Sequence, residues 1–160
     1  MKDKEFRVHR SVLIARSTVF ESMFEHDMKE KKTGVINIDD CDPDSFGDFL
    51  QYLYTGKAEN VSPRSALHLY CTAHKYDVKE LKSFCVAYLM RNLTVENICD
   101  VVTLAEQYDE EELHSAAQVF FSKNVGRVLS TVKWETLLQE NYRLANKLLK
   151  EMATKIKIQA

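Results

Sequence analysis

The sequence contains few residues that interrupt helices and no cysteine pair of the kind found in zinc sites. Only four glycines and two prolines occur in 160 residues, so we expect helices to dominate the fold. The four cysteines lie 30, 14 and 14 positions apart, and none belongs to a C-x-x-C pair. We therefore expect reduced thiols that pack as small hydrophobic side chains: Cys41, Cys71, Cys85 and Cys99.

The sequence also lacks a long apolar run and a large net charge. No apolar run approaches the roughly 20 residues that cross a bilayer, and the first ten residues, MKDKEFRVHR, lack the apolar segment of a secretory signal. The net charge of −2 argues against non-specific binding to nucleic acid. Four lysines near the end favour a solvated helix face over a nucleic-acid site. We expect a protein of the nucleus or the cytoplasm, with neither membrane nor nucleic acid as a partner.

Residue sets for catalysis are missing as well. No serine has a neighbouring His–Asp arrangement, and there is no glycine-rich phosphate loop. His68, Cys71 and His74 could suggest metal ligands, but at about 100° per residue they spread over about 120° of one helix. Packing or exposure is the simpler explanation for them. Asp109 and Glu112 are typical of a capping box that opens a helix. We therefore expect no enzyme and no cofactor.

Two start signals bound the predicted helices in the middle of the chain. Asp42 and Pro43 supply an N-cap followed by proline at the first helical position, and Ser62 and Pro63 repeat this signal. Between the two signals, Gly56 ends the first helix.

Apolar stripes predict further helices in the second half of the chain. Trp134 should anchor them, because one large aromatic residue in a small bundle usually lies in the core. The last helix starts at about Arg143. Two short strands are predicted at residues 5–8 and 35–38, and the second is β-branched on either side of an asparagine. The apolar face of the last helix consists of Leu144, Leu148 and Met152.

Residues 9–30, HRSVLIARSTVFESMFEHDMKE, are the most informative stretch of the chain. Their apolar spacing predicts two short amphipathic helices followed by a charged loop. Ser17 fits the N-cap of the second helix, because its hydroxyl can accept a hydrogen bond from an otherwise unpaired backbone N–H. In the charged loop, Met28 is either incidental or an exposed apolar anchor for a partner.

The pattern H-x-x-V/I-L-x-A-R-S-x-x-F-x-x-M-F in this stretch strongly resembles the signature of BTB/POZ domains. Its continuation, FEHDMKE, is similar to the speckle-type POZ (MATH-BTB) branch of that family. Further along, FGDFLQYLYTGKAE and AHKYDVKELKSFCVAYL resemble the family's later helices. NLTVENICDVVTLAEQYDEEEL is similar to the three-box that follows the BTB domain in cullin adaptors. The resemblance implies an α+β, mostly helical fold: a BTB/POZ-like domain with a small sheet at residues 1–91, then a three-box/BACK-like helical region at residues 92–160.

The N-terminus differs from the family pattern. In the family, a helix and a strand precede the residues that correspond to residues 5–9, and a MATH domain belongs to the same branch. The resemblance therefore implies a fragment or a shortened family member, whose two strands lose the strand between them. Because the missing helix forms much of the family's dimer interface, we expect a monomer or a weak dimer. A weak dimer would use Leu149 and Ile156 of the last helix, unless both pack within one chain.

The function implied by the resemblance is that of a non-catalytic adaptor. Such an adaptor binds cullin-3 and links a cullin-RING ubiquitin ligase to substrate proteins, which here would bind through a domain that these residues do not include. In similar adaptors a hydrophobic-x-Glu motif contacts cullin-3, which corresponds to Met28 and Glu30, with His26 beside them. Tyr76 and Asp77 lie near the same contact. The alternative is a BTB dimerisation or scaffold module without a ligase role, as in transcription regulators.

Overall fold

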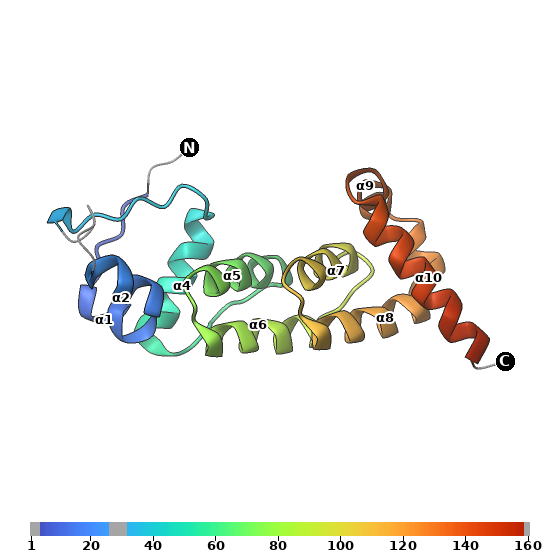
Figure 1. The fold of residues 1–160 in the computed structure, drawn as a ribbon, viewed down its shortest axis with the longest axis horizontal. Helices are drawn as coiled ribbons and strands as arrows, with labels where there is room; N and C mark the ends of the chain where they lie inside the picture. Colours follow the sequence, from blue (N-terminus) through green and yellow to red (C-terminus); the bar gives the residue numbers. More distant parts are fainter. Residues whose placement is uncertain (1–3, 26–31, 159–160) are drawn as a thin grey trace. The chain divides into compact units, whose positions relative to one another are not determined.

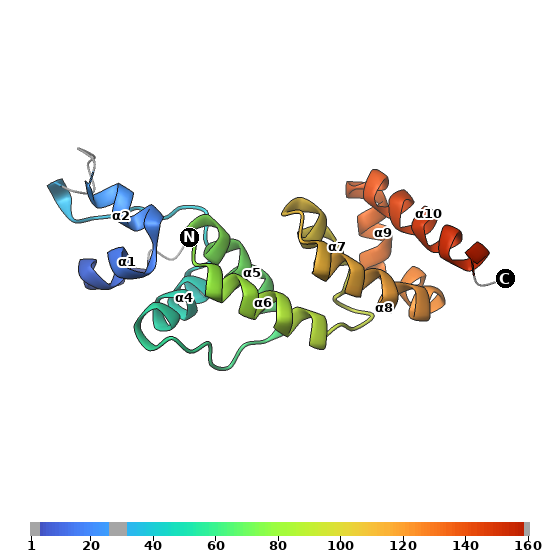
Figure 2. The same ribbon diagram turned by 60° about the horizontal axis from the view of Figure 1, so that its bottom comes forward.

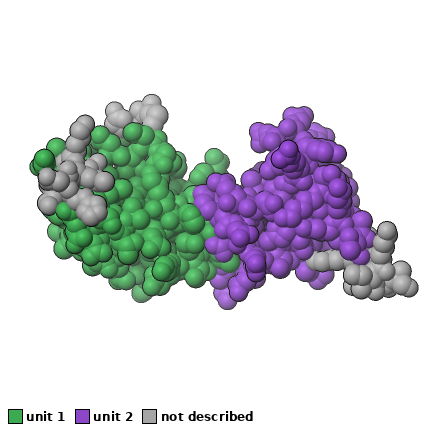
Figure 3. Space-filling model, in the orientation of Figure 1, with its two compact units in different colours: residues 1–86 green, residues 87–160 purple. Residues whose placement is uncertain are grey.

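The computed structural model describes residues 4–25 and 32–158, except for the side chains of residues 155–158 (Figures 1 and 2). The chain divides into two compact units, Met1–Val86 and Ala87–Ala160, drawn in green and purple in Figure 3. No helix in the described part is long and apolar enough to cross a membrane. The main helices are α1 (Arg10–Arg16), α2 (Thr18–Glu25), α4 (Pro43–Thr55), α5 (Pro63–Lys75), α6 (Lys79–Arg91), α7 (Ile98–Gln107), α8 (Glu111–Leu129), α9 (Val132–Glu140) and α10 (Tyr142–Ile158).

Short-range hydrogen bonds set the ends of α4 and α5, as the sequence predicts. The Asp42 carboxylate accepts from the backbone N–H of Ser45 at 2.9 Å. Ser62 Oγ accepts from the backbone N–H of Ser65 at 3.1 Å, and Ser65 Oγ accepts from the backbone N–H of Ser62 at 2.8 Å. Gly56 follows α4 with φ of 70°, a left-handed conformation that glycine adopts without steric cost. These predicted helix boundaries are confirmed.

The first unit is built on aromatic side chains at the contacts between helices. The helices α1 and α2 pack against each other, α1 also contacts α4, and α4 and α5 lie side by side (Figure 2). Ser17 Oγ accepts from the backbone N–H of Phe20 at 3.2 Å, which confirms the predicted N-cap of α2. The buried aromatic side chains of this unit include Phe20, Phe46, Phe49, Tyr70 and Tyr76.

The two predicted strands do not form. Residues 5–8 and 35–38 have no regular secondary structure, and among the described residues neither segment makes a backbone-to-backbone hydrogen bond. β-Propensity acts only where a neighbouring strand supplies hydrogen bonds and side-chain contacts. The small sheet of the predicted α+β fold is therefore not found in the described part of the chain, which is mostly helical.

In the second unit, α7 packs on α8, and α9 lies beside α10 (Figure 2). Trp134 is buried and its ring lies 5.4 Å from that of Phe121, which confirms its predicted place in the core. The helix α8 runs to Leu129 with a kink at Asn124 (φ −124°, ψ 17°). The Asn124 side-chain amide donates to the carbonyl of Phe120 at 3.0 Å, so this helix bends without ending.

The predicted capping box of Asp109 and Glu112 is wrong. The N-cap of α8 is Glu110, and it makes no side-chain capping hydrogen bond. Asp109 instead follows Tyr108, the C-cap of α7, in the left-handed conformation (φ 55°), and the N–H of Glu110 donates to the carbonyl of Ala105 at 2.9 Å. This is the geometry of a helix C-terminus. Asp109 therefore terminates α7, and its side chain does not open α8.

Candidate protein-interaction surface

Three of the predicted cullin contacts, His26, Met28 and Glu30, lie outside the described residues. The helix before them is described, since α2 ends at Glu25. The position of α2 therefore determines where the segment with these three residues begins.

The last turn of α2 is fixed to α1 by one arginine. Arg10 Nη2 donates to the carbonyl of Phe24 at 2.8 Å, and the guanidinium lies 4.5 Å from the centroid of the Phe24 ring. A cation near a helix C-terminus is favoured by the helix dipole, and the ring face adds a cation–π contact. The end of α2 that leads into residues 26–31 is thus held by both a polar and an aromatic contact.

The first turn of α2 is fixed to the end of α5 by two hydroxyl groups. Ser17 Oγ donates to the carbonyl of Tyr76 at 2.6 Å, and Ser17 is buried. Thr18 Oγ1 donates to Asp77 Oδ2 at 3.0 Å. We call the four residues Ser17, Thr18, Tyr76 and Asp77 the α2–α5 junction. The junction brings two of the five predicted cullin-contact residues to the start of α2.

Within the junction, Tyr76 is a core residue. Its side chain is 1% exposed, and its ring is stacked on that of Phe20 with centroids 4.4 Å apart and planes at 12°. Phe46 and Phe49 complete the cluster at 6.0 and 5.5 Å. Burial raises the pKa of Tyr76 above its usual value. The ring is therefore inaccessible to a partner, and it supports the junction from inside.

Asp77 is the half-exposed member of the junction. It follows Tyr76, the C-cap of α5, and adopts a left-handed conformation (φ 52°), and the N–H of Val78 donates to the carbonyl of Ala73 at 2.8 Å. Asp and Asn tolerate this conformation better than other residues with a side chain. The backbone requirement at the end of α5 thus places a carboxylate beside the start of α2.

Arg10 and Thr18 hold the two ends of α2, and the sequence does not predict their role. Thr18 follows the N-cap of α2, but its partner Asp77 is 59 residues away, so the sequence gives no local signal for their contact. Arg10 and Phe24 are 14 residues apart on different helices, and the same limit applies to them.

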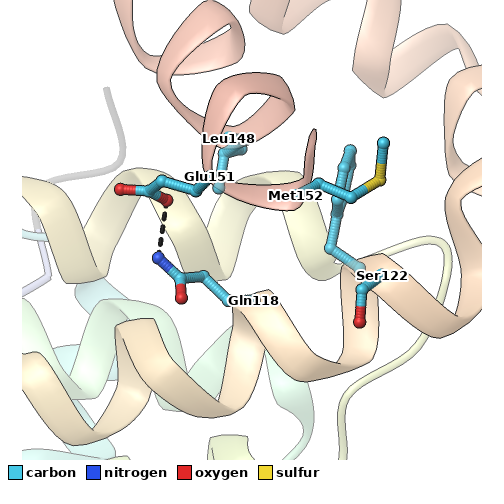
Figure 4. A pocket seen from close by; sticks show the side chains of 6 residues that line it. Gln118, Ser122, Leu148, Glu151 and Met152 are labelled. Atoms are coloured by element: carbon cyan, nitrogen blue, oxygen red, sulfur yellow. Dashed lines mark hydrogen bonds between the residues drawn. The ribbon is translucent and has the colours of Figure 1, made fainter. Parts of the chain in front are cut away.

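The terminal helix α10 is attached to the second unit by apolar and ionic contacts. Lys147 Nζ lies 2.6 Å from Glu106 Oε2 on α7. Figure 4 shows the hydrogen bond from Gln118 on α8 to Glu151 on α10, at the edge of a small pocket. Leu148 is buried between these contacts. The pocket is lined by Gln118, Phe121, Ser122, Leu148, Glu151 and Met152.

The two residues predicted for self-association lie on α10. Leu149 is half-buried, whereas the side chain of Ile156 lies outside the described part of the structure. Leu144 and Leu148, which the sequence assigns to the inward face, are each 3% exposed. The inward position of Leu144 and Leu148 is therefore confirmed, whereas Met152, predicted for the same face, is half-buried. Self-association through Leu149 and Ile156 stays a prediction.

Metal-ligating side chains do not converge in the described part of the chain, where no group of three or more His, Cys, Asp or Glu side chains could hold an ion. His68, Cys71 and His74 lie on α5, and the His74 ring stacks on that of Tyr70 at 6.2 Å. His68 and His74 are exposed at the surface of α5, and Cys71 is half-buried.

A match to one protein family covers the whole of the first unit. The profile of the BTB/POZ domain matches residues 1–93, more than half of the chain. The chain belongs to the BTB/POZ family. TD and POZ domain-containing protein 5 of Mus musculus is 36% identical to this BTB/POZ chain over 141 residues, which is 88% of the chain. The chain spans 42% of the length of that relative. Family membership makes the BTB/POZ chain a protein-interaction module.

All four cysteines of the BTB/POZ chain are free, and they differ in burial. Burial raises the pKa of Cys85 to about 12 and that of Cys99 to about 11, so both are neutral thiols at pH 8. Because the thiolate is the reactive form, we expect iodoacetamide to modify the half-buried Cys41 and Cys71 before Cys85 and Cys99. Mass spectrometry of tryptic peptides at successive times measures the order.

Denatured chain is the control for this measurement, since all four thiols should then react at similar rates. Rapid modification of Cys85 in the folded chain would contradict its assignment to the core.

The raised pKa values of the two buried thiols also make the stability of the fold depend on pH. The folded-state pKa values of Cys85 and Cys99 lie above the reference value of 9.0. Their contribution to stability is therefore complete below pH 9 and is lost as the pH rises toward 11 and 12.

The variant Leu149→Asp tests self-association of the BTB/POZ chain through α10. A charge in an apolar contact between copies should weaken that contact by about tenfold or more, while the half-buried position keeps the chain folded. Sedimentation equilibrium measures the effect, and the variant of the exposed neighbour, Lys150→Asp, is the control. A tight dimer that Leu149→Asp leaves unchanged would exclude α10 as the interface.

Proposed function

We propose that this chain is a non-catalytic adaptor that binds cullin-3 and links a cullin-RING ubiquitin ligase to substrate proteins. The observation that carries the proposal is the BTB/POZ match over residues 1–93, together with the Met-x-Glu motif of Met28 and Glu30 directly after α2. Met28 would enter an apolar pocket of cullin-3, and Glu30 would fix the loop against it. His26 would lie at the edge of this contact.

The geometry of α2 supports a contact that uses both of its ends. The eight residues of α2 span about 12 Å at about 1.5 Å per residue, so this distance separates the α2–α5 junction from the start of residues 26–31. Asp77 is half-exposed at one end, and the Met28 motif follows the other. We assign Asp77 a direct contact with cullin-3, and we assign Tyr76 a positioning role because its ring is buried.

In this function the chain would be one part of a larger ligase assembly. Ubiquitin transfer would be carried out by the ligase partners, and substrates would bind through a domain outside these 160 residues. We propose that the chain acts in the nucleus, the cytoplasm or both. The alternative, a dimerisation or scaffold module without a ligase role, fits the same fold.

Titration of the purified chain with purified cullin-3 in a calorimeter tests the proposal. We expect saturable binding with one cullin-3 for each chain. A chain that is folded by circular dichroism but gives no binding signal would overturn the adaptor function. If such a chain also self-associates in sedimentation experiments, the scaffold function would replace it.

The variant Asp77→Asn tests the direct contact of Asp77. Asparagine also tolerates the left-handed conformation and can still accept from Thr18, so the melting temperature should stay unchanged. The loss of this half-exposed charge should weaken cullin-3 binding by up to about fivefold. Asp109→Asn is the matched control, because Asp109 has the same backbone conformation (φ 55°) in the second unit. Equal affinities for the two variants would remove Asp77 from the contact.

A further inference from the structure

Ser62 and Pro63 form a Ser-Pro dipeptide, and no other serine or threonine of the sequence is followed by proline. Proline-directed protein kinases select this pair of residues. Ser62 is exposed, and its backbone is extended (φ −98°, ψ 161°). It ends the connection between α4 and α5, which contains no helix or strand from residue 56 to residue 62 (Figure 2). A kinase binds its acceptor residue in an extended segment, so this position meets both the sequence requirement and the conformational one.

The hydroxyl group of Ser62 makes contacts that a phosphate can retain. Ser62 Oγ accepts from the backbone N–H of Ser65 at 3.1 Å and donates to Ser65 Oγ at 3.1 Å. Ser65 Oγ has a second donor, because the N–H of Ser62 bonds to it at 2.8 Å. Phosphorylation removes the hydroxyl proton of Ser62 and supplies oxygens that accept from both the N–H and the hydroxyl group of Ser65. The modification therefore leaves no polar group of this cap without a partner.

The start of α4 shows that the same arrangement accommodates an anion. Residues 42–45, DPDS, and residues 62–65, SPRS, share the order of N-cap, proline, charged residue and serine. In α4 the Asp42 carboxylate accepts from the N–H and from the hydroxyl group of Ser45, at 2.9 and 3.0 Å. These hydrogen bonds hold the pKa of Asp42 below its usual value, so they favour the charged form. A phosphate on Ser62 would occupy the equivalent place at the start of α5.

The first turn of α5 carries a positive charge. It contains no acidic residue, and Arg64 is exposed there. A cation near a helix N-terminus opposes the helix dipole, whereas a phosphate, with about −1.5 to −2 charges at pH 7, is favoured at this end. Arg64 can also form a charge-assisted hydrogen bond with a phosphate on the neighbouring turn. Both effects predict that phosphorylation stabilises the start of α5.

We propose that Ser62 is phosphorylated by a proline-directed protein kinase, and that the phosphate stabilises the first unit. The kinase transfers the γ-phosphoryl group of ATP to Ser62 Oγ. A bond forms between this oxygen and the γ-phosphorus, the bond from that phosphorus to the bridging oxygen breaks, and ADP and the hydroxyl proton leave. The α2–α5 junction lies at the other end of α5, about 20 Å away for 13 residues. The proposal therefore concerns the stability of the fold, and it is independent of the proposed binding of cullin-3.

Treatment of the folded full chain with a purified mitogen-activated protein kinase and ATP tests the site. Mass spectrometry of tryptic peptides should find phosphate at Ser62. The variant Ser62→Ala should remove it, and Pro63→Ala should slow its incorporation by about tenfold or more. Thr131 is the internal control, because it is also an extended N-cap and accepts from the N–H of Trp134 at 3.2 Å, but valine follows it. A synthetic peptide of residues 57–67 reports whether the kinase accepts the sequence outside the fold.

Thermal denaturation of the phosphorylated chain tests the stabilising role. The melting temperature of the first unit should rise by about 2–6 °C. Ser62→Asp places a carboxylate at the same cap and should give a smaller rise, and Arg64→Gln should reduce the gain from phosphorylation. A folded chain that stays unmodified overturns the site, and so does equal phosphorylation of Thr131; reaction of the peptide alone would show that the fold protects Ser62. A melting temperature that phosphorylation lowers or leaves unchanged overturns the stabilising role.

Discussion

Replacement of Tyr76 by alanine is expected to lower the free energy of unfolding of the Met1–Val86 unit by about 3–5 kcal/mol. The ring is 1% exposed and contacts three other aromatic rings, so its removal leaves a cavity and removes stacking with Phe20. Because a domain of this size is stable by only about 5–15 kcal/mol, this is a large part of the total. Urea denaturation followed by circular dichroism measures the loss, and amide hydrogen exchange locates it.

Tyr76→Phe is the matched control for this result. Phenylalanine keeps the ring and its stacking, so the free energy of unfolding should fall by about 1 kcal/mol or less. The two variants should also separate in hydrogen exchange, with α2 and α4 exchanging faster only in Tyr76→Ala. Equal stability of wild type and Tyr76→Ala would show that the α2–α5 junction does not depend on the buried ring.

The variant Met28→Asp is expected to weaken cullin-3 binding by about thirtyfold or more. An apolar anchor at an interface is commonly worth about 2 kcal/mol or more, and an aspartate in its place would also bring an unpaired charge into an apolar pocket. Met28 is the one apolar residue of the sequence HDMKE (residues 26–30), which favours an exposed position, so the melting temperature should stay unchanged. Isothermal titration calorimetry and thermal denaturation measure the two quantities.

Met28→Leu is the control for this second experiment. Leucine keeps an apolar side chain of similar volume and should retain most of the affinity. Unchanged affinity of Met28→Asp would remove Met28 from the cullin contact. A lower melting temperature together with weaker binding would instead assign Met28 to the core of the first unit.

The features that the sequence predicts correctly depend on residues three or four positions apart. Ser17, Asp42 and Ser62 each accept a hydrogen bond from a backbone N–H three residues later, and Gly56 needs only its own conformational freedom. Such interactions form wherever the local sequence permits a helix.

Some features are predicted wrongly from the sequence, or not at all. They depend on residues far apart in the chain, or on a residue that could serve either of two adjacent helices. Residues 5–8 and 35–38 have strand propensity, but a strand needs a partner that local sequence cannot specify. Asp109 could open α8 or terminate α7, and the requirement for a left-handed residue after α7 decided the outcome.

The candidate interaction surface also has a part that the sequence identifies and a part that only the structure shows. The sequence motif identifies Met28 and Glu30 through the family resemblance alone, and both lie outside the described residues. The contacts that hold α2 in place join residues 14 and 59 positions apart, so they are visible only in the folded chain. The sequence therefore supplies the proposed contact residues, while the structure explains how the helix before them is held.

The order in which the helices pack has a consequence for the folding rate. The pairs α1 and α2, α4 and α5, α7 and α8, and α9 and α10 are each consecutive in the chain, so each pair closes only a short loop. Helical domains dominated by contacts close in sequence fold in about microseconds to milliseconds. Each helical pair can thus form soon after it leaves the ribosome, which shortens the time during which its apolar face is exposed to aggregation.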